Sequence, residues 1–124
     1  MDTHNDQDSD LRRFVRRLTK DNYQVVDTED WTVFGTVLDL SVRGLRIARK
    51  TALKVGSVHD LTVDPTLHLS DITPIRIGGK VRWCDQESAD SWICGLEIKA
   101  IGRADSVEME TLFSRIGQES WTED

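Results

Sequence analysis

Apolar and polar residues alternate in short runs from residue 22 to residue 99. Alternation with a period of two puts successive side chains on opposite faces of a strand, so each run predicts a β-strand. Six to eight such runs at close spacing favour a barrel or a sandwich. The predicted strands are Asn22–Asp27, Trp31–Leu40, Gly44–Arg49, Val58–Val63, Leu67–Leu69, Ile72–Ile77, Lys80–Cys84 and Trp92–Lys99.

The alternation also assigns side chains to faces. Pro74 demotes the start of its run to an edge or a bulge, Gly78-Gly79 marks a turn or a bulge, and residues Asp85–Ser91 read as a polar loop. Residues predicted to share a face are Val33, Gly35, Val37 and Asp39; Leu45 and Ile47, with Arg46 opposite; Val81 and Trp83; and Cys94, Leu96 and Ile98.

The pattern changes to a helical one near the C-terminus. Asp105 with Glu108 three residues later predicts the start of a helix, and Gly117 predicts its end. The helix carries one apolar stripe, as expected of a lid on a β-core. The stripe consists of Met109, Leu112, Phe113 and Ile116.

The 124 residues therefore fit one domain. Residues 1–20 are predicted to be a flexible linker, because the first eleven offer almost nothing to bury. Residues 21–117 form the β-domain with its helix, and residues 118–124 form a tail.

Charge is unevenly distributed. The net charge of −6 argues against a general nucleic-acid binder, yet residues 11–20 carry five positive charges and no acid. A focused cationic segment on an acidic body suits a small, multiply charged anion. No apolar run approaches the roughly 18 residues that span a membrane, and the polar start excludes a secretory signal, so the cytoplasm is the expected location.

Side chains for metal binding or catalysis are not grouped. His4, His59 and His68 are scattered, so we expect no metal site and no cofactor. Cys84 and Cys94 flank one predicted loop and are expected to be reduced thiols in strands, with a cross-strand pairing as the geometrically conceivable alternative. No nucleophile–base pair or carboxylate dyad stands at a workable spacing, so we expect no enzyme.

Two clusters carry the candidate chemistry. The first, Arg12-Arg13-Phe14-Val15-Arg16-Arg17, holds four guanidinium groups, which suit phosphate oxygens and the acceptor edge of guanine. The second, Asp39-Leu40-Ser41-Val42-Arg43-Gly44, has the spacing D-x-S-x-x-G, which suits the donor edge of a base. Taken alone, the first is also typical of a solvated surface and the second of a tight turn.

Together the clusters resemble the PilZ domain, the bacterial receptor module for cyclic di-GMP, whose pattern is R-x-x-x-R followed by [D/N]-x-S-x-x-G. The pairs Arg12/Arg16 and Arg13/Arg17 both satisfy the first motif. The resemblance covers roughly residues 12–117 and includes Leu53–Val58, Gly79–Trp83 and Ile93–Ile98, where Ile98 replaces an aromatic residue.

The resemblance implies a mainly β fold: a six-stranded antiparallel β-barrel with a flexible basic N-terminal linker and one C-terminal α-helix. It implies that cyclic di-GMP orders the linker, which then signals to an unidentified partner protein. The implied ligand-binding residues are Arg12, Arg13, Arg16, Asp39, Ser41 and Gly44, with Arg17, Arg43 and Trp83 as secondary candidates.

Several alternatives stay open. For Trp83, core packing is favoured over stacking on a base. A PilZ-like adaptor that works by protein contact and binds no nucleotide is the alternative function, and binding of single-stranded nucleic acid would require a basic body. The sequence does not decide the oligomeric state or whether one or two ligand molecules bind.

Overall fold

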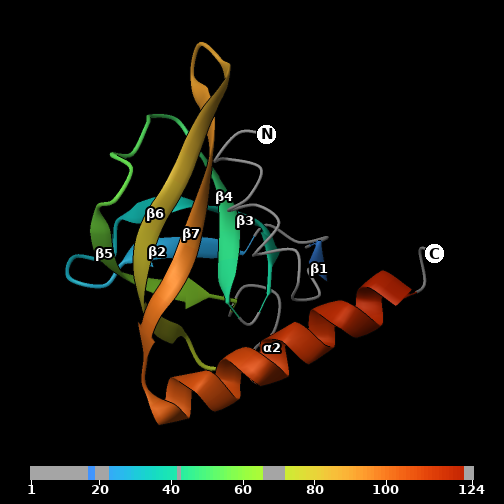
Figure 1. Ribbon diagram of the computed structural model, residues 1–124. Coiled ribbons are helices and arrows are strands. Elements are labelled where there is room, and N and C mark those ends of the chain that lie inside the picture. The colour runs from blue at the N-terminus through green and yellow to red at the C-terminus, as the bar shows by residue number, and fades with distance from the viewer. Residues whose placement is uncertain (1–16, 19–22, 42, 66–71, 122–124) are drawn as a thin grey trace.

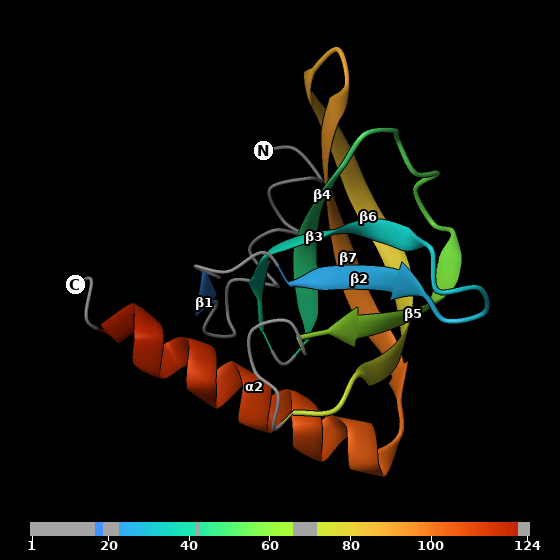
Figure 2. The same cartoon turned by 180° about the vertical axis from the view of Figure 1, so that it is seen from behind.

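The computed structural model describes residues 17–18, 23–41, 43–65 and 72–121. Figures 1 and 2 show a strongly curved antiparallel sheet with a long C-terminal helix across one end. The elements are β1 (Arg17–Leu18), β2 (Gln24–Asp27), β3 (Val33–Leu40), β4 (Gly44–Arg49), β5 (Val58–Asp64), β6 (Ile75–Ser88), β7 (Ser91–Ile101) and α2 (Arg103–Trp121).

Six strands close into a barrel, as predicted. The order is β3-β2-β5-β6-β7-β4, and β4 pairs back onto β3 to complete the circle. The short strand β1 pairs with the C-terminal end of β3, at Asp39 and Leu40. The predicted strand Leu67–Leu69 lies outside the described residues.

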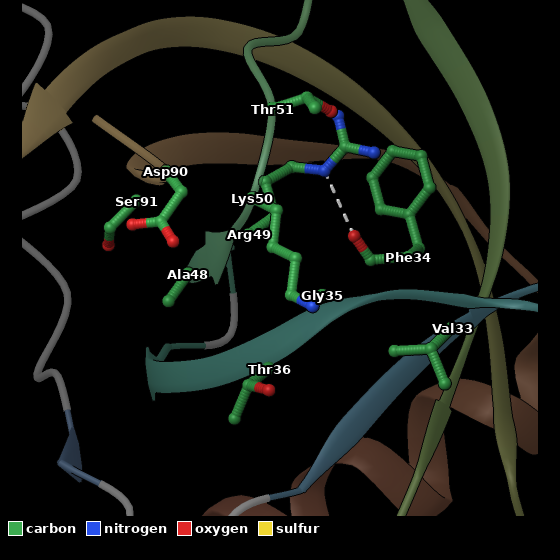
Figure 3. A pocket seen from close by; sticks show the side chains of 10 residues that line it. All are labelled: Val33, Phe34, Gly35, Thr36, Ala48, Arg49, Lys50, Thr51, Asp90 and Ser91. Atoms are coloured by element: carbon green, nitrogen blue, oxygen red, sulfur yellow. Dashed lines mark hydrogen bonds between the residues drawn. The ribbon is translucent and has the colours of Figure 1, made fainter. Parts of the chain in front are cut away.

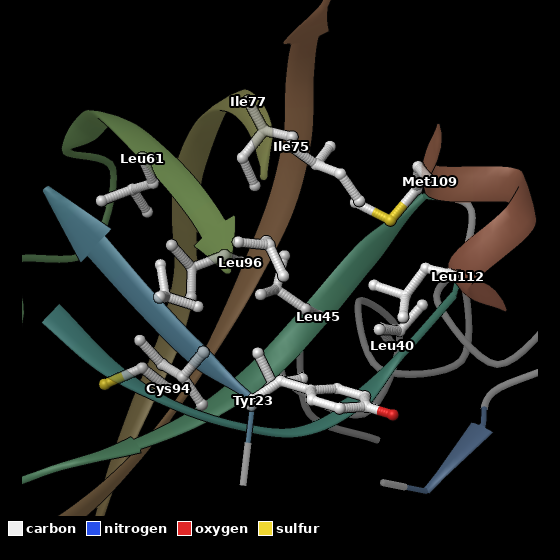
Figure 4. Close-up of a cluster of buried hydrophobic side chains, with 14 of the residues drawn as sticks. Tyr23, Leu40, Leu45, Leu61, Ile75, Ile77, Cys94, Leu96, Met109 and Leu112 are labelled. Carbon is white, nitrogen blue, oxygen red and sulfur yellow. The ribbon is translucent and has the colours of Figure 1, made fainter. Parts of the chain in front are cut away.

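The core fills the barrel and continues under the helix. Figure 4 shows aliphatic side chains from facing strands meeting Met109 and Leu112 of α2. Leu112 is fully buried and Met109 nearly so, which confirms the predicted role of the stripe as a lid. The side chain of Ile116 lies outside the described part.

The predicted limits of strand β6 and of the loop after it were wrong. β6 runs without interruption from Ile75 to Ser88, and the expected loop Asp85–Ser91 is instead a hairpin whose strands pair as far as Ser88 with Ser91. Its tip is solvent-exposed on both faces, so backbone pairing forms it without apolar alternation. The register of β6 against β7 shifts between Gly78 and Gly79, but the extra residue there is Lys99 of β7, so β6 itself passes through the two glycines without a turn. β6 begins directly after Pro74.

The helix also differs from the prediction. It begins at Arg103, two residues before the predicted cap, and continues past Gly117 to Trp121. Asp105 and Glu108 instead accept hydrogen bonds from the backbone N–H groups of Arg76 and Thr73, at 3.3 Å each. The two acids therefore fasten the first turns of α2 to the start of β6.

The cysteine prediction was wrong as well. Cys84 and Cys94 are opposite each other in the register of β6 and β7, with their Cα atoms 4.1 Å apart, and a disulfide joins them. The expectation of free thiols rested on a cytosolic location, whereas the register of the hairpin puts the two cysteines opposite each other, as the alternative required.

Candidate functional site

The D-x-S-x-x-G motif forms the connection from β3 to β4. The Ser41 N–H donates to the Gly44 carbonyl oxygen at 2.8 Å, and the Ser41 hydroxyl lies 3.4 Å from the same oxygen. The hydroxyl also accepts the Arg43 N–H at 3.3 Å. Ser41 is buried, and Gly44 begins β4 opposite Glu97. Ser41 and Gly44 thus close a tight turn.

Asp39 lies on a different face from the one predicted. The register of β3 against β4 shifts between Val37 and Asp39, so a β-bulge at Leu38 puts Asp39 opposite Arg46. Arg46 stands between two core residues, so it and Asp39 share the outer face of the barrel. The Arg46 Nε and Nη2 atoms lie 2.7 Å and 2.6 Å from one carboxylate oxygen, Asp39 Oδ2.

A second bulge, in β6, changes the barrel face on which Trp83 lies. The register of β6 against β7 shifts between Val81 and Trp83, which puts Trp83 opposite Gly95. The prediction that Val81 and Trp83 share a face was therefore wrong. Cys94 and Leu96 point into the core, so the intervening Gly95 faces outward. A Cβ atom at Gly95 would overlap the Trp83 indole, which shows that the ring lies over this glycine on the outer face.

These positions form one row across the outer face. Asp39 is opposite Arg46, Arg46 is opposite Gly95, and the Trp83 ring covers Gly95. We call Asp39, Arg46, Gly95 and Trp83 the outer row. It combines a carboxylate, a guanidinium group and an indole, which are the groups that recognise a planar, polar, anionic ligand.

The described end of the arginine cluster joins this row. In β1, Leu18 pairs with Asp39 and Arg17 pairs with Leu40. Arg17, the last residue of the first cluster, therefore lies beside the second motif. Arg12, Arg13 and Arg16 lie outside the described residues.

Further guanidinium groups surround the row. Arg43 is exposed in the β3–β4 turn, and its carbonyl oxygen accepts the Ile98 N–H at 2.9 Å. Arg82, at the β6 bulge, pairs with Glu97 at 3.3 Å. Arg46 and Arg82 of this group are each paired with an acid, Asp39 and Glu97.

Arg46 was not singled out from the sequence. The alternation within β4 showed that it faces outward, but only the bulge at Leu38 brings Asp39 to it. A bulge of this kind leaves no residue signature in a run such as Val37-Leu38-Asp39-Leu40, so the ion pair had no detectable signal.

A pocket of about 520 Å³ lies at the opposite end of the β3–β4 pair from the motif turn. Figure 3 shows it between the ends of these strands and the tip of the β6–β7 hairpin. Arg49 donates from Nε to the Phe34 carbonyl oxygen at 3.0 Å, and its guanidinium carbon lies 4.6 Å from the centre of the Phe34 ring. Burial lowers the pKa of Arg49. No residue of either motif lines this pocket.

The described residues contain no group of three or more His, Cys, Asp or Glu side chains arranged to hold a metal ion. Their helix is not apolar enough to cross a membrane.

Comparison with known proteins identifies relatives of this fold. A family model described as PilZ domain matches residues 10–115. Among curated proteins, none matches the chain.

Solved structures with the same fold include three from bacteria. The "PilZ domain with c-di-GMP of YcgR from Escherichia coli" has a TM-score of 0.67 at 12% identity, covering 90% of this chain and 95% of that one. The Bacillus subtilis inhibitor of motility, MotI/DgrA, has a TM-score of 0.67 at 17% identity over 91% of this chain and 52% of that one. MrkH of K. pneumonia has a TM-score of 0.66 at 14% identity, with coverages of 87% and 50%. The chain thus spans about half the length of the last two.

Proposed function

The chain belongs to the PilZ domain family, and from that premise we propose that it is a receptor for cyclic di-GMP that signals through a partner protein. The observation that carries the proposal is the pairing of β1 with β3, which puts Arg17, the last residue of the arginine cluster, opposite Leu40 and its neighbour Leu18 opposite Asp39. The YcgR PilZ domain was solved with this nucleotide.

The proposed binding residues fall into two groups. The arginines of the linker (Arg12, Arg13 and Arg16, supported by Arg17) would bind phosphates and guanine edges. On the barrel, Asp39 would accept guanine N–H groups, while Ser41 and Gly44 let the backbone approach closely. Each charge-assisted hydrogen bond contributes roughly 1.5–3 kcal/mol. A few of them offset the ordering of the linker and leave an affinity of about micromolar or better.

The Trp83 indole would add a stacking surface. It lies on the outer face beside Arg46, where a guanine ring would contact both groups. Arg43 is exposed at the edge of the same face and is placed to attract phosphate.

Ligand binding would then act as a switch. Guanidinium groups that repel one another would gather around the two phosphates of one nucleotide, and this would order the linker against β3 and create a new surface for the partner. A PilZ domain is a ligand-binding module, so the signal would be a change of surface and not a catalysed reaction.

Titration calorimetry with cyclic di-GMP tests the proposal and also reports how many ligand molecules bind. We expect binding by the unmodified protein and a loss of about tenfold or more in affinity for Asp39→Asn or Arg16→Ala. Asp60→Asn is the matched control, because Asp60 forms an ion pair with Arg76 away from the row. No binding by the unmodified protein would reject the proposal and favour an adaptor that works by protein contact alone.

A further inference from the structure

The Asp39–Arg46 ion pair is unequally exposed. The Asp39 side chain retains 3% of its accessible surface and the Arg46 side chain retains 32%. A molecule that settles on the outer row therefore meets the guanidinium group first, and the carboxylate lies behind it. Arg46, and not Asp39, is therefore the member of the pair that is placed to contact a ligand.

The geometry of the pair also fixes the direction of Arg46. Its Nε and Nη2 atoms both contact Asp39 Oδ2. A guanidinium group is a rigid, planar fork, so two contacts to one carboxylate oxygen hold the whole plane. Its other N–H groups are then oriented in advance, which lowers the entropy lost when they bind an acceptor.

The surroundings of Arg46 suit a purine base. On one side, the register partner Gly95 has no side chain, and the flat indole of Trp83 covers that position. Arginine donates in bidentate fashion to O6 and N7 of guanine. The indole beside it is buried, with 8% of the Trp83 surface exposed, so it would contact a base through that exposed part.

We propose that Arg46, which belongs to neither motif, contacts the O6/N7 edge of a guanine, and that Asp39 acts mainly as the residue that positions it. This inference rests on the proposed function. It reassigns Asp39 from a direct acceptor of guanine N–H groups to a support for the arginine in front of it.

A nucleotide analogue separates this role from a purely structural one. In cyclic di-GMP with 7-deazaguanine bases, N7 is replaced by carbon, so one acceptor of the bidentate contact is lost. We expect the unmodified protein to prefer cyclic di-GMP over this analogue by about tenfold. Arg46→Met should weaken cyclic di-GMP binding by about tenfold and remove most of that preference.

Two further variants complete the design. Arg46→Lys keeps the charge beside Asp39 but lacks the fork, so it should keep the melting temperature and still lose the preference for N7. Arg76→Met is the matched control, because Arg76 forms a similar ion pair with Asp60 on β5 and should change neither affinity nor preference.

A double-mutant cycle tests the positioning role of Asp39. If Asp39 acts through Arg46, Asp39→Asn combined with Arg46→Met should bind no more weakly than Arg46→Met alone. Additive losses, or an Arg46→Met protein that is weakened but keeps the N7 preference, would overturn the inference. Failure of the unmodified protein to bind cyclic di-GMP is a separate result, since it rejects the proposed function itself.

Discussion

At the scale of single residues, Gly95 decides the shape of the outer row. A Cβ atom there would overlap the Trp83 indole, and neighbouring side chains on both strands are fixed in the core. The glycine is therefore required for the ring to lie flat across β7, next to Arg46.

Gly95→Ala should consequently destabilise the protein by roughly 1–3 kcal/mol, because the indole must leave its position or the strands must separate. The same change should weaken cyclic di-GMP binding, since the stacking surface moves. Urea unfolding and calorimetry measure the two effects. Gly102→Ala is the control, because its Cβ would meet only an ordinary contact at 3.6 Å. Equal stability of the two variants would contradict this account of Gly95.

At the scale of elements, the strands could be predicted from the sequence but the faces of two of them could not. The alternation in β4 and β7 predicted the buried residues Leu45, Ile47, Cys94 and Leu96 correctly, and Ile98 is partly buried against the same core. In β3 the extra residue Leu38 reverses the alternation and moves Asp39 to the outer face, and in β6 the extra residue Arg82 does the same for Trp83. The motifs therefore indicated a candidate site, whereas the bulges determine which side chains lie together on the outer face.

The ends of β3, β4 and β5 meet in a second cluster with a testable pH response. The centres of the His59 and Phe34 rings lie 5.0 Å apart. The Arg49 guanidinium carbon lies 4.6 Å from the centre of the same Phe34 ring. Burial and then the Arg49 charge lower the pKa of His59 below its usual 6.5, and Asp27 opposes this in part. The unfolded chain therefore takes up the proton first as pH falls, so the contribution of His59 to stability is lost below about pH 6.5.

We expect the melting temperature to fall between pH 7.5 and 5.5, and to fall less in His59→Gln. Asp60, whose pKa is lowered by its hydrogen bonds with Arg76, stays charged in this range and does not contribute. Parallel melting curves for the two proteins across this range measure the difference. Identical pH profiles would show that His59 is not the group responsible.

At the scale of the whole molecule, β1 links the site to the helix. Its backbone pairs with β3 at Asp39 and Leu40, and the same strand contacts α2. A two-residue edge strand has few hydrogen bonds, so its amides exchange through local opening and not through global unfolding. A ligand that binds between the arginine cluster and the outer row must suppress this opening, and the effect passes to α2 through the contact with β1.

Hydrogen exchange with and without cyclic di-GMP tests this connection. Amides of Arg17, Leu18 and the adjoining end of β3 should exchange at least about tenfold more slowly with saturating ligand, and α2 should gain protection where it contacts β1. The β2–β3 turn, Thr28–Thr32, is a matched reference, because it is also exposed but lies at the other end of β3 from the site. Protection that rises equally in this turn would point to general stabilisation. If protection rises only in β3, and not in β1 or α2, then ligand binding does not affect the linker or the helix. The proposed signal could then not reach a partner surface on the helix.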